Sequence, residues 1–116
     1  MKIIVLLNGG LKTCCKTLPT DMVRISLENW FKSDKNIEMN VIDKTESDVK
    51  FDKLASLAVN ALGDNAYPMI FLDNVLMSVG KLPEYRTLHD MARQPHRAGL
   101  TEQDIFKLEN AEFPSN

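Results

Sequence analysis

Two kinds of apolar pattern alternate along this chain: short apolar runs, and longer stretches with an apolar residue at every third or fourth position. Lys2–Leu7 is a run of β-branched residues and leucines that stops at Gly9 and Gly10, which is typical of a strand buried on both faces. Pro19 has the fixed φ that suits a first helical turn, and helical spacing continues to about Ser33. The apolar positions of this predicted helix are Met22, Val23, Leu27, Trp30 and Phe31.

The middle of the chain predicts a second strand and a second helix. Ile37, Met39 and Val41 alternate with more polar residues, which predicts a strand from Asn36 to Asp43. The helix that follows is the clearest element of the whole pattern, and Gly63 is placed to end it. Its apolar positions are Phe51, Leu54, Ala55, Ala58, Val59 and Leu62.

A β-hairpin and a third helix come next. Met69–Leu72 and Val75–Val79 have the pattern of two strands, and Asp73-Asn74 between them is a two-residue turn. Pro83 opens a helix, and the apolar positions that it turns inward are Tyr85, Leu88, Met91 and Ala92.

One shift of composition divides the chain. The turn-like stretch 94–99 separates a main body, residues 1–93, from a tail, residues 94–116. In the tail, Thr101 and Asp104 have the spacing of a capping pair, which predicts a short helix to about residue 110 that packs on the body or trails from it. The order of elements is therefore βαβαββα plus a tail helix.

This order indicates an α/β architecture. A βαβ unit requires a right-handed crossover and a parallel pair, and the hairpin and helix complete a four-stranded mixed sheet with helices on both faces. The order resembles the thioredoxin-like fold. Cys14 and Cys15 fall between the first strand and the first helix, and Tyr67-Pro68 stands directly before the hairpin. The resemblance implies that Cys14 and Cys15 are the active-site thiols, and that Tyr67 and a cis Pro68 form the substrate contact beside them.

The adjacent cysteines make the resemblance to particular groups within this fold more specific. The chain is similar to two small thioredoxin-fold groups, disulfide oxidoreductases of the YuzD type and arsenic metallochaperones of the ArsD type. It has no Cys-x-x-Cys motif. The ArsD-type proteins also use a third cysteine a few residues on, where this chain has residues 16–20 without one. An ArsD-like metalloid site would therefore hold only Cys14 and Cys15 as its own ligands.

The sequence around the pair favours Cys15 as the reactive thiol. Cysteine reacts as the thiolate, which a helix N-terminus or a neighbouring cation stabilises. Cys15 is nearer to the helix expected at Pro19, and Lys12 and Lys16 flank the pair. Consecutive Cα atoms are about 3.8 Å apart, whereas a comfortable disulfide needs roughly 4.4–6.8 Å. A bridge between the two would be strained and easily reduced, which suits a switch or transient carrier.

Three functions follow from this pattern. The first is thiol–disulfide exchange with a protein or small-molecule thiol or disulfide, without a cofactor. The second is a carrier of a metalloid or soft metal bound by Cys14 and Cys15, since thiolates are soft ligands. The third is a non-catalytic adaptor of the same fold, in which the cysteines are inert and the tail helix or a sheet edge binds a partner.

Composition and charge exclude other classes. The chain has 14 Lys and Arg against 16 Asp and Glu, a formal charge of −2, with mixed signs along the sequence, which argues against a nucleic-acid binder. The first apolar run, Ile3 to Leu7, is too short for a signal peptide or a membrane span, so we expect a cytoplasmic protein without membrane contact.

Several residues with possible chemistry have a simpler interpretation. Asp43, Glu46 and Asp48 alternate with lysines and are expected to be a solvated approach to the second helix. His89 and His96 lack metal-ligand spacing to the cysteines and are expected to be solvated or satisfied in the core. Five methionines fall on predicted core faces and are expected to fill gaps there: Met22, Met39, Met69, Met77 and Met91.

Overall fold

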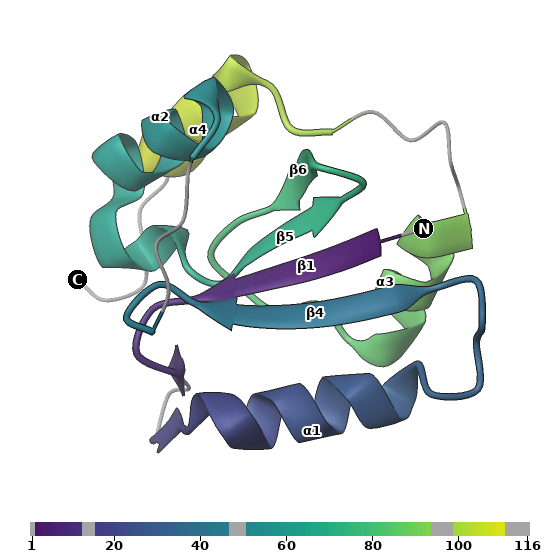
Figure 1. The fold of residues 1–116 in the computed structure, drawn as a ribbon. Coiled ribbons are helices and arrows are strands. Elements are labelled where there is room, and N and C mark those ends of the chain that lie inside the picture. Colours follow the sequence, from purple (N-terminus) through teal and green to yellow (C-terminus); the bar gives the residue numbers. More distant parts are fainter. Residues whose placement is uncertain (1, 13–15, 47–50, 94–98, 111–116) are drawn as a thin grey trace.

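The computed structural model describes residues 2–12, 16–46, 51–93 and 99–110. Its centre is a four-stranded mixed sheet in the order β4-β1-β5-β6 (Figure 1). Strand β4 runs parallel to β1, whereas β5 is antiparallel to both β1 and β6. The strands are β1 (Lys2–Leu7), β4 (Glu38–Asp43), β5 (Met69–Leu72) and β6 (Val75–Ser78). The expected α/β class and four-stranded mixed sheet are confirmed.

Helices cover both faces of this sheet, as expected (Figure 1). Helices α1 (Thr20–Trp30) and α3 (Tyr85–Arg93) pack on one face, and α2 (Lys53–Leu62) and α4 (Glu102–Asn110) on the other. A short 3-10 turn, Gly63–Ala66, follows α2. Among the described residues, no helix has the length and apolar character needed to span a membrane.

Two hydrophobic cores result, because successive side chains of β1 point to opposite faces. Ile3, Val5 and Leu7 join the core under α1 and α3, and Leu6 joins the core under α2 and α4. In the second core, Ile105 of α4 is completely buried. The tail helix therefore packs against α2 as part of the fold.

Local signals explain where the helices begin and end. The side chain of Asp52 accepts a hydrogen bond from the backbone N–H of Ala55 at 2.8 Å and caps α2. Gly63, at φ +59°, follows the last residue of α2 as expected. Thr101 and Asp104 form the expected reciprocal cap of α4: the Asp104 carboxylate accepts from the Thr101 N–H at 2.9 Å, and the Thr101 hydroxyl accepts from the Asp104 N–H at 3.2 Å.

Parts of the predicted inner helix faces are wrong. The buried stripe of α1 is formed by Thr20, Val23 and Leu27 and continues to Phe31, which is buried as expected. Met22 and Trp30 each precede a residue of this stripe by one position, about 100° around the helix, and are 56% and 39% exposed. Tyr85, expected to face inward, is also 39% exposed. The other four methionines are buried or partly buried.

Candidate functional site

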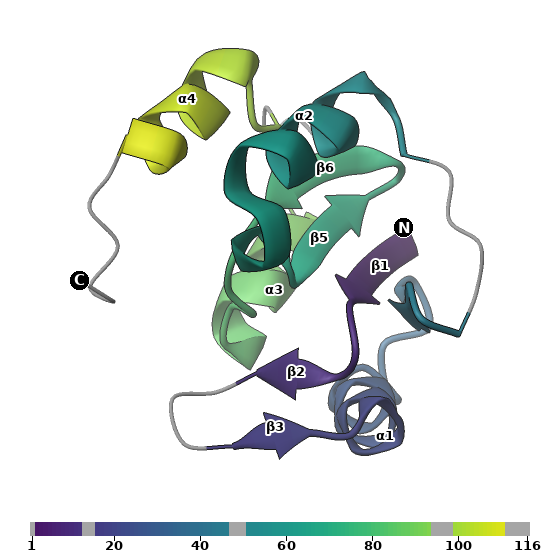
Figure 2. The same cartoon turned by 90° about the vertical axis from the view of Figure 1, so that its left-hand side faces the viewer.

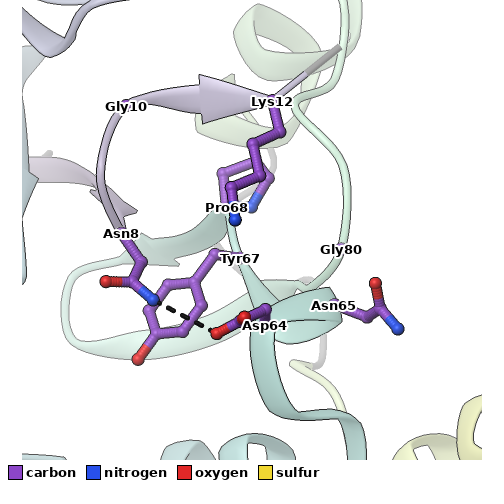
Figure 3. A pocket seen from close by; sticks show the side chains of 8 residues that line it. All are labelled: Asn8, Gly10, Lys12, Asp64, Asn65, Tyr67, Pro68 and Gly80. Atoms are coloured by element: carbon purple, nitrogen blue, oxygen red, sulfur yellow. Dashed lines mark hydrogen bonds between the residues drawn. The ribbon is translucent and has the colours of Figure 1, made fainter. Parts of the chain in front are cut away.

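A cavity of about 270 Å³ opens beyond the carboxyl end of β1. Three segments form its walls: the residues that follow β1, the segment before β5, and Gly80, two positions after the end of β6 (Figure 3). Its lining residues are Asn8, Gly10, Lys12, Asp64, Asn65, Tyr67, Pro68 and Gly80. Two of the residues that the sequence singled out, Tyr67 and Pro68, are thus part of this cavity.

Pro68 is held firmly in the cavity wall. It is buried, and the peptide bond between Tyr67 and Pro68 is cis, the geometry that the family resemblance implied. The backbone N–H of Gly80 donates to the carbonyl oxygens of Ala66 and Pro68, at 3.1 Å in each case. The segment after β6 is therefore tied to the residues on both sides of Tyr67.

The remaining lining residues give the cavity a mixed polar character. Lys12 contributes an ammonium group and Asp64 a carboxylate, and the amide of Asn8 donates to the Asp64 carboxylate at 3.4 Å (Figure 3). The hydroxyl of Tyr67 is buried and has no hydrogen-bond partner among the described residues. The lining therefore contains both hydrogen-bond donors and acceptors that suit a polar ligand.

The segment between β1 and α1 contains a small antiparallel sheet that the sequence pattern did not predict. Strand β2 (Leu11–Lys12) pairs with β3 (Thr17–Leu18), with Lys12 opposite Thr17 (Figure 2). Two-residue strands are too short to produce a recognisable apolar alternation. Cys14 and Cys15 fall between these strands in the sequence and lie outside the described residues.

Asp43, the last residue of β4, is buried next to this segment and is only 2% exposed. Its Oδ1 accepts hydrogen bonds from the Gly9 N–H, the Thr45 N–H and the Thr45 hydroxyl, at 2.9, 2.9 and 2.6 Å. Its Oδ2 accepts from the Gly10 N–H at 2.8 Å and from the Thr20 hydroxyl. The expectation that Asp43 is solvated is wrong. Its position in the strand alternates with Met39 and Val41, which places it on the face covered by α1.

The charge of Asp43 is stabilised by these donors. Burial acts to raise its pKa, but hydrogen bonds from Thr20, Thr45 and Gly9 outweigh that effect and hold the pKa well below its ordinary value. The carboxylate is therefore ionised at neutral pH and keeps its acceptors available to the surrounding N–H and O–H groups.

His89, on α3, is not among the residues that line this cavity. His89 is half-buried, stacks on Phe31 and lies 3.5 Å from the carboxylate of Asp34, which agrees with a histidine satisfied within the fold. His96 and Asp48 lie outside the described residues. In the part of the chain that the structure describes, no group of three or more His, Cys, Asp or Glu side chains could hold a metal ion.

Sequence reasoning missed most of the cavity. Asn8, Asp64, Asn65 and Gly80 were not predicted, because they lie in turns, and turn residues reveal little about which distant segment they meet. For Asp64 and Asn65, the available signal was their position between the helix end at Gly63 and the Tyr67-Pro68 pair.

The chain matches no protein-family model, no curated protein and no solved structure.

Proposed function

We propose that this chain is a thioredoxin-like thiol protein that exchanges disulfides through Cys14 and Cys15. The observation that carries the proposal is the cavity in which Pro68 lies beside Gly10 and Lys12, the residues that precede the cysteine pair in the sequence. The sheet order β4-β1-β5-β6, with only β4 and β1 parallel, supports the same fold class.

The cysteine pair follows the cavity residue Lys12 closely in the sequence. Cys14 follows Lys12 by two residues. Cys15 precedes Lys16 and lies five positions before Thr20, the first residue of α1. Because a helix N-terminus and an adjacent cation both favour a thiolate, Cys15 is the nucleophile of the proposal.

The proposed reaction has two steps. The Cys15 thiolate attacks one sulfur of a substrate disulfide, forms a mixed disulfide with it and releases the other half as a thiolate. The Cys14 thiolate then attacks the Cys15 sulfur, releases the second half as a thiolate and leaves a Cys14–Cys15 disulfide. An external dithiol reduces that bond and is itself oxidised, which restores both thiols. The strain expected of a bridge between adjacent cysteines favours this last step.

The experiment is a comparison of wild type with Cys14→Ser and Cys15→Ser. The reduced proteins are mixed with hydroxyethyl disulfide and dithiothreitol, and turnover is measured. In parallel, they are titrated with arsenite. We expect turnover in wild type, its loss in Cys15→Ser, and accumulation of a mixed disulfide in Cys14→Ser. Arsenite binding without turnover would replace the proposal with the carrier function, and neither result in wild type would leave the adaptor function.

A further inference from the structure

We propose that Asp43 is the positioning residue of the thiol segment: it holds both ends of the stretch that carries Cys14 and Cys15, and thereby sets their reactivity without touching substrate. This inference rests on the proposed function for its meaning in catalysis, but it makes a separate claim about how Asp43 holds Gly10 and Thr20.

The two oxygens of one carboxylate reach both ends of this stretch. At its start, the N–H groups of Gly9 and Gly10 donate to Asp43 at 2.9 and 2.8 Å. At its end, the hydroxyl of Thr20, the first residue of α1 and only 7% exposed, donates to the same carboxylate. Gly10 and Thr20 are both bound to Oδ2, so a single atom links the entry and the exit of the stretch.

The carboxylate is itself fixed by rigid structure. Asp43 ends β4 and pairs in register with Leu7, the last residue of the central strand β1. Thr45 donates to its Oδ1 from both the backbone and the side chain. Five donors from described residues bind the two oxygens of this carboxylate. These hydrogen bonds fix the orientation of the Asp43 side chain.

The connection to reactivity passes through Gly10. Gly10 is buried, lines the cavity with Pro68, and is followed directly by β2. A shift of its backbone moves β2 and its partner β3 relative to Pro68. Small displacements of a reacting group change rates strongly, because the attack distance and angle are both affected.

Asp43→Asn changes the hydrogen bonds to Gly10 and Thr20 with almost no change in the shape of the side chain. The amide keeps one acceptor oxygen, and its NH₂ group must face the donors on the other side. If that group takes the place of Oδ2, the Thr20 hydroxyl can turn to accept from it, but the Gly10 N–H loses its acceptor. The other orientation would leave two N–H groups, those of Gly9 and Thr45, without their acceptor oxygen. The first orientation costs fewer hydrogen bonds, so we expect the variant to release Gly10.

Thr20 provides a matched pair of variants. Thr20→Val has nearly the shape of threonine but no hydroxyl, and Thr20→Ser keeps the hydroxyl that donates to Asp43. Ile105→Ala serves as a control for lost stability, because Ile105 is fully buried in α4 on the opposite face of the sheet.

The test measures iodoacetamide alkylation of each cysteine across pH 6–10, together with disulfide turnover, under conditions where circular dichroism shows every variant folded. We expect Asp43→Asn and Thr20→Val to reduce kcat about tenfold or more, with a smaller change in KM. We also expect them to bring the alkylation rates of Cys14 and Cys15 to within about twofold of each other. Thr20→Ser and Ile105→Ala should behave as wild type.

Two results overturn the inference. The first is that Asp43→Asn and Thr20→Val keep the wild-type alkylation profiles. The second is that Ile105→Ala shows the same reduction of kcat and the same change in alkylation as these two variants. Alkylation requires no disulfide turnover. If wild type lacks turnover but Asp43→Asn still alters the alkylation profile, the proposed function fails and the positioning role stands. If wild type has turnover and Asp43→Asn leaves both the turnover and the alkylation profile unchanged, the proposed function stands and the positioning role fails.

Discussion

Gly10 lies so close to Leu18 that no other residue fits in its place. A Cβ atom built on Gly10 would be 2.4 Å from the carbonyl oxygen of Leu18, and real Cβ atoms do not approach that closely. Gly10 also has a φ of +90°, a conformation that residues with a side chain rarely adopt. The turn after β1 and the short β2–β3 sheet therefore depend on this glycine.

Gly9 and Gly10 provide a matched comparison of that dependence. Both have positive φ, but a Cβ on Gly9 would meet nothing within 4 Å. We expect Gly9→Ala to lower the free energy of unfolding by about 1–2 kcal/mol through backbone strain alone. Gly10→Ala should cost at least about 1 kcal/mol more, because it adds a steric clash. Urea denaturation measures both, and equal losses would contradict the close packing of Gly10 against Leu18.

The pKa of Asp43 leads to a pH dependence of stability. Because this pKa is lower in the folded protein than the ordinary 3.8, the unfolded chain takes up the proton first as the pH falls. The contribution of Asp43 is therefore fully present above about pH 4 and is lost progressively below it. Urea denaturation at pH 7, 4 and 3 measures this loss.

Asp43→Asn supplies the control for that measurement. The variant should be less stable than wild type by about 1.5–3 kcal/mol at pH 7, the cost of removing a charged acceptor from buried donors. The difference should shrink as the pH falls from 4 to 3, since the unfolded wild-type chain then takes up a proton at Asp43 while the folded chain keeps the charge. A difference that stays constant over this range would show that the carboxylate keeps its ordinary pKa.

The depth of burial of Ile105 predicts how firmly α4 is attached. Ile105 is completely buried, so Ile105→Ala should lower the free energy of unfolding by about 2–5 kcal/mol. Leu54 of α2 belongs to the same core but is only half-buried, so Leu54→Ala should cost less, about 1 kcal/mol. Both are measured by urea denaturation. If α4 were a loose tail, Ile105→Ala would be the milder of the two changes.

The hairpin turn between β5 and β6 predicts a contrast between two substitutions of one residue. Asp73 and Asn74 have φ values of +47° and +71°, and Asn74 is exposed. Asn74→Ala should cost about 1 kcal/mol, because alanine tolerates this conformation poorly. Asn74→Gly removes the whole side chain, Cβ included, and should nevertheless stay within about 0.5 kcal/mol of wild type, because glycine adopts positive φ freely. Thermal unfolding of the two variants tests the contrast, and equal shifts in Tm would refute the turn geometry.

The sequence predicted the strands and the helices well, because their patterns are long enough to repeat. Met69–Leu72 was predicted with its observed bounds, and the helix ending at Gly63 was found from its spacing. Inner and outer faces of α1 were harder to separate. Met22 and Ile25 are apolar but more than half exposed, and an error of one position, about 100° around the helix, cannot be recognised without knowing what the helix packs against.

The site was predicted only in part. Tyr67 and Pro68 were found through a family resemblance, and both line the cavity. Asp43 was assigned to solvent because lysines and acids surround it in the sequence, although its strand position indicated burial. The groups that stabilise its charge are backbone N–H groups and a hydroxyl from distant segments, and such partners leave no charge pattern in a sequence.

The central place of β1 has a consequence for how the chain folds as it is synthesised. Lys2 pairs with Glu38, and Ile3 pairs with Leu72 on the other side, so both neighbours of β1 are made much later than β1 itself. The apolar segment that forms β1 is therefore exposed until the ribosome has added the segments that form β4 and β5. Such long-range pairing slows folding and exposes an aggregation-prone strand in the meantime. Lys2–Leu7 is the segment that a chaperone acting on the nascent chain would have most reason to bind.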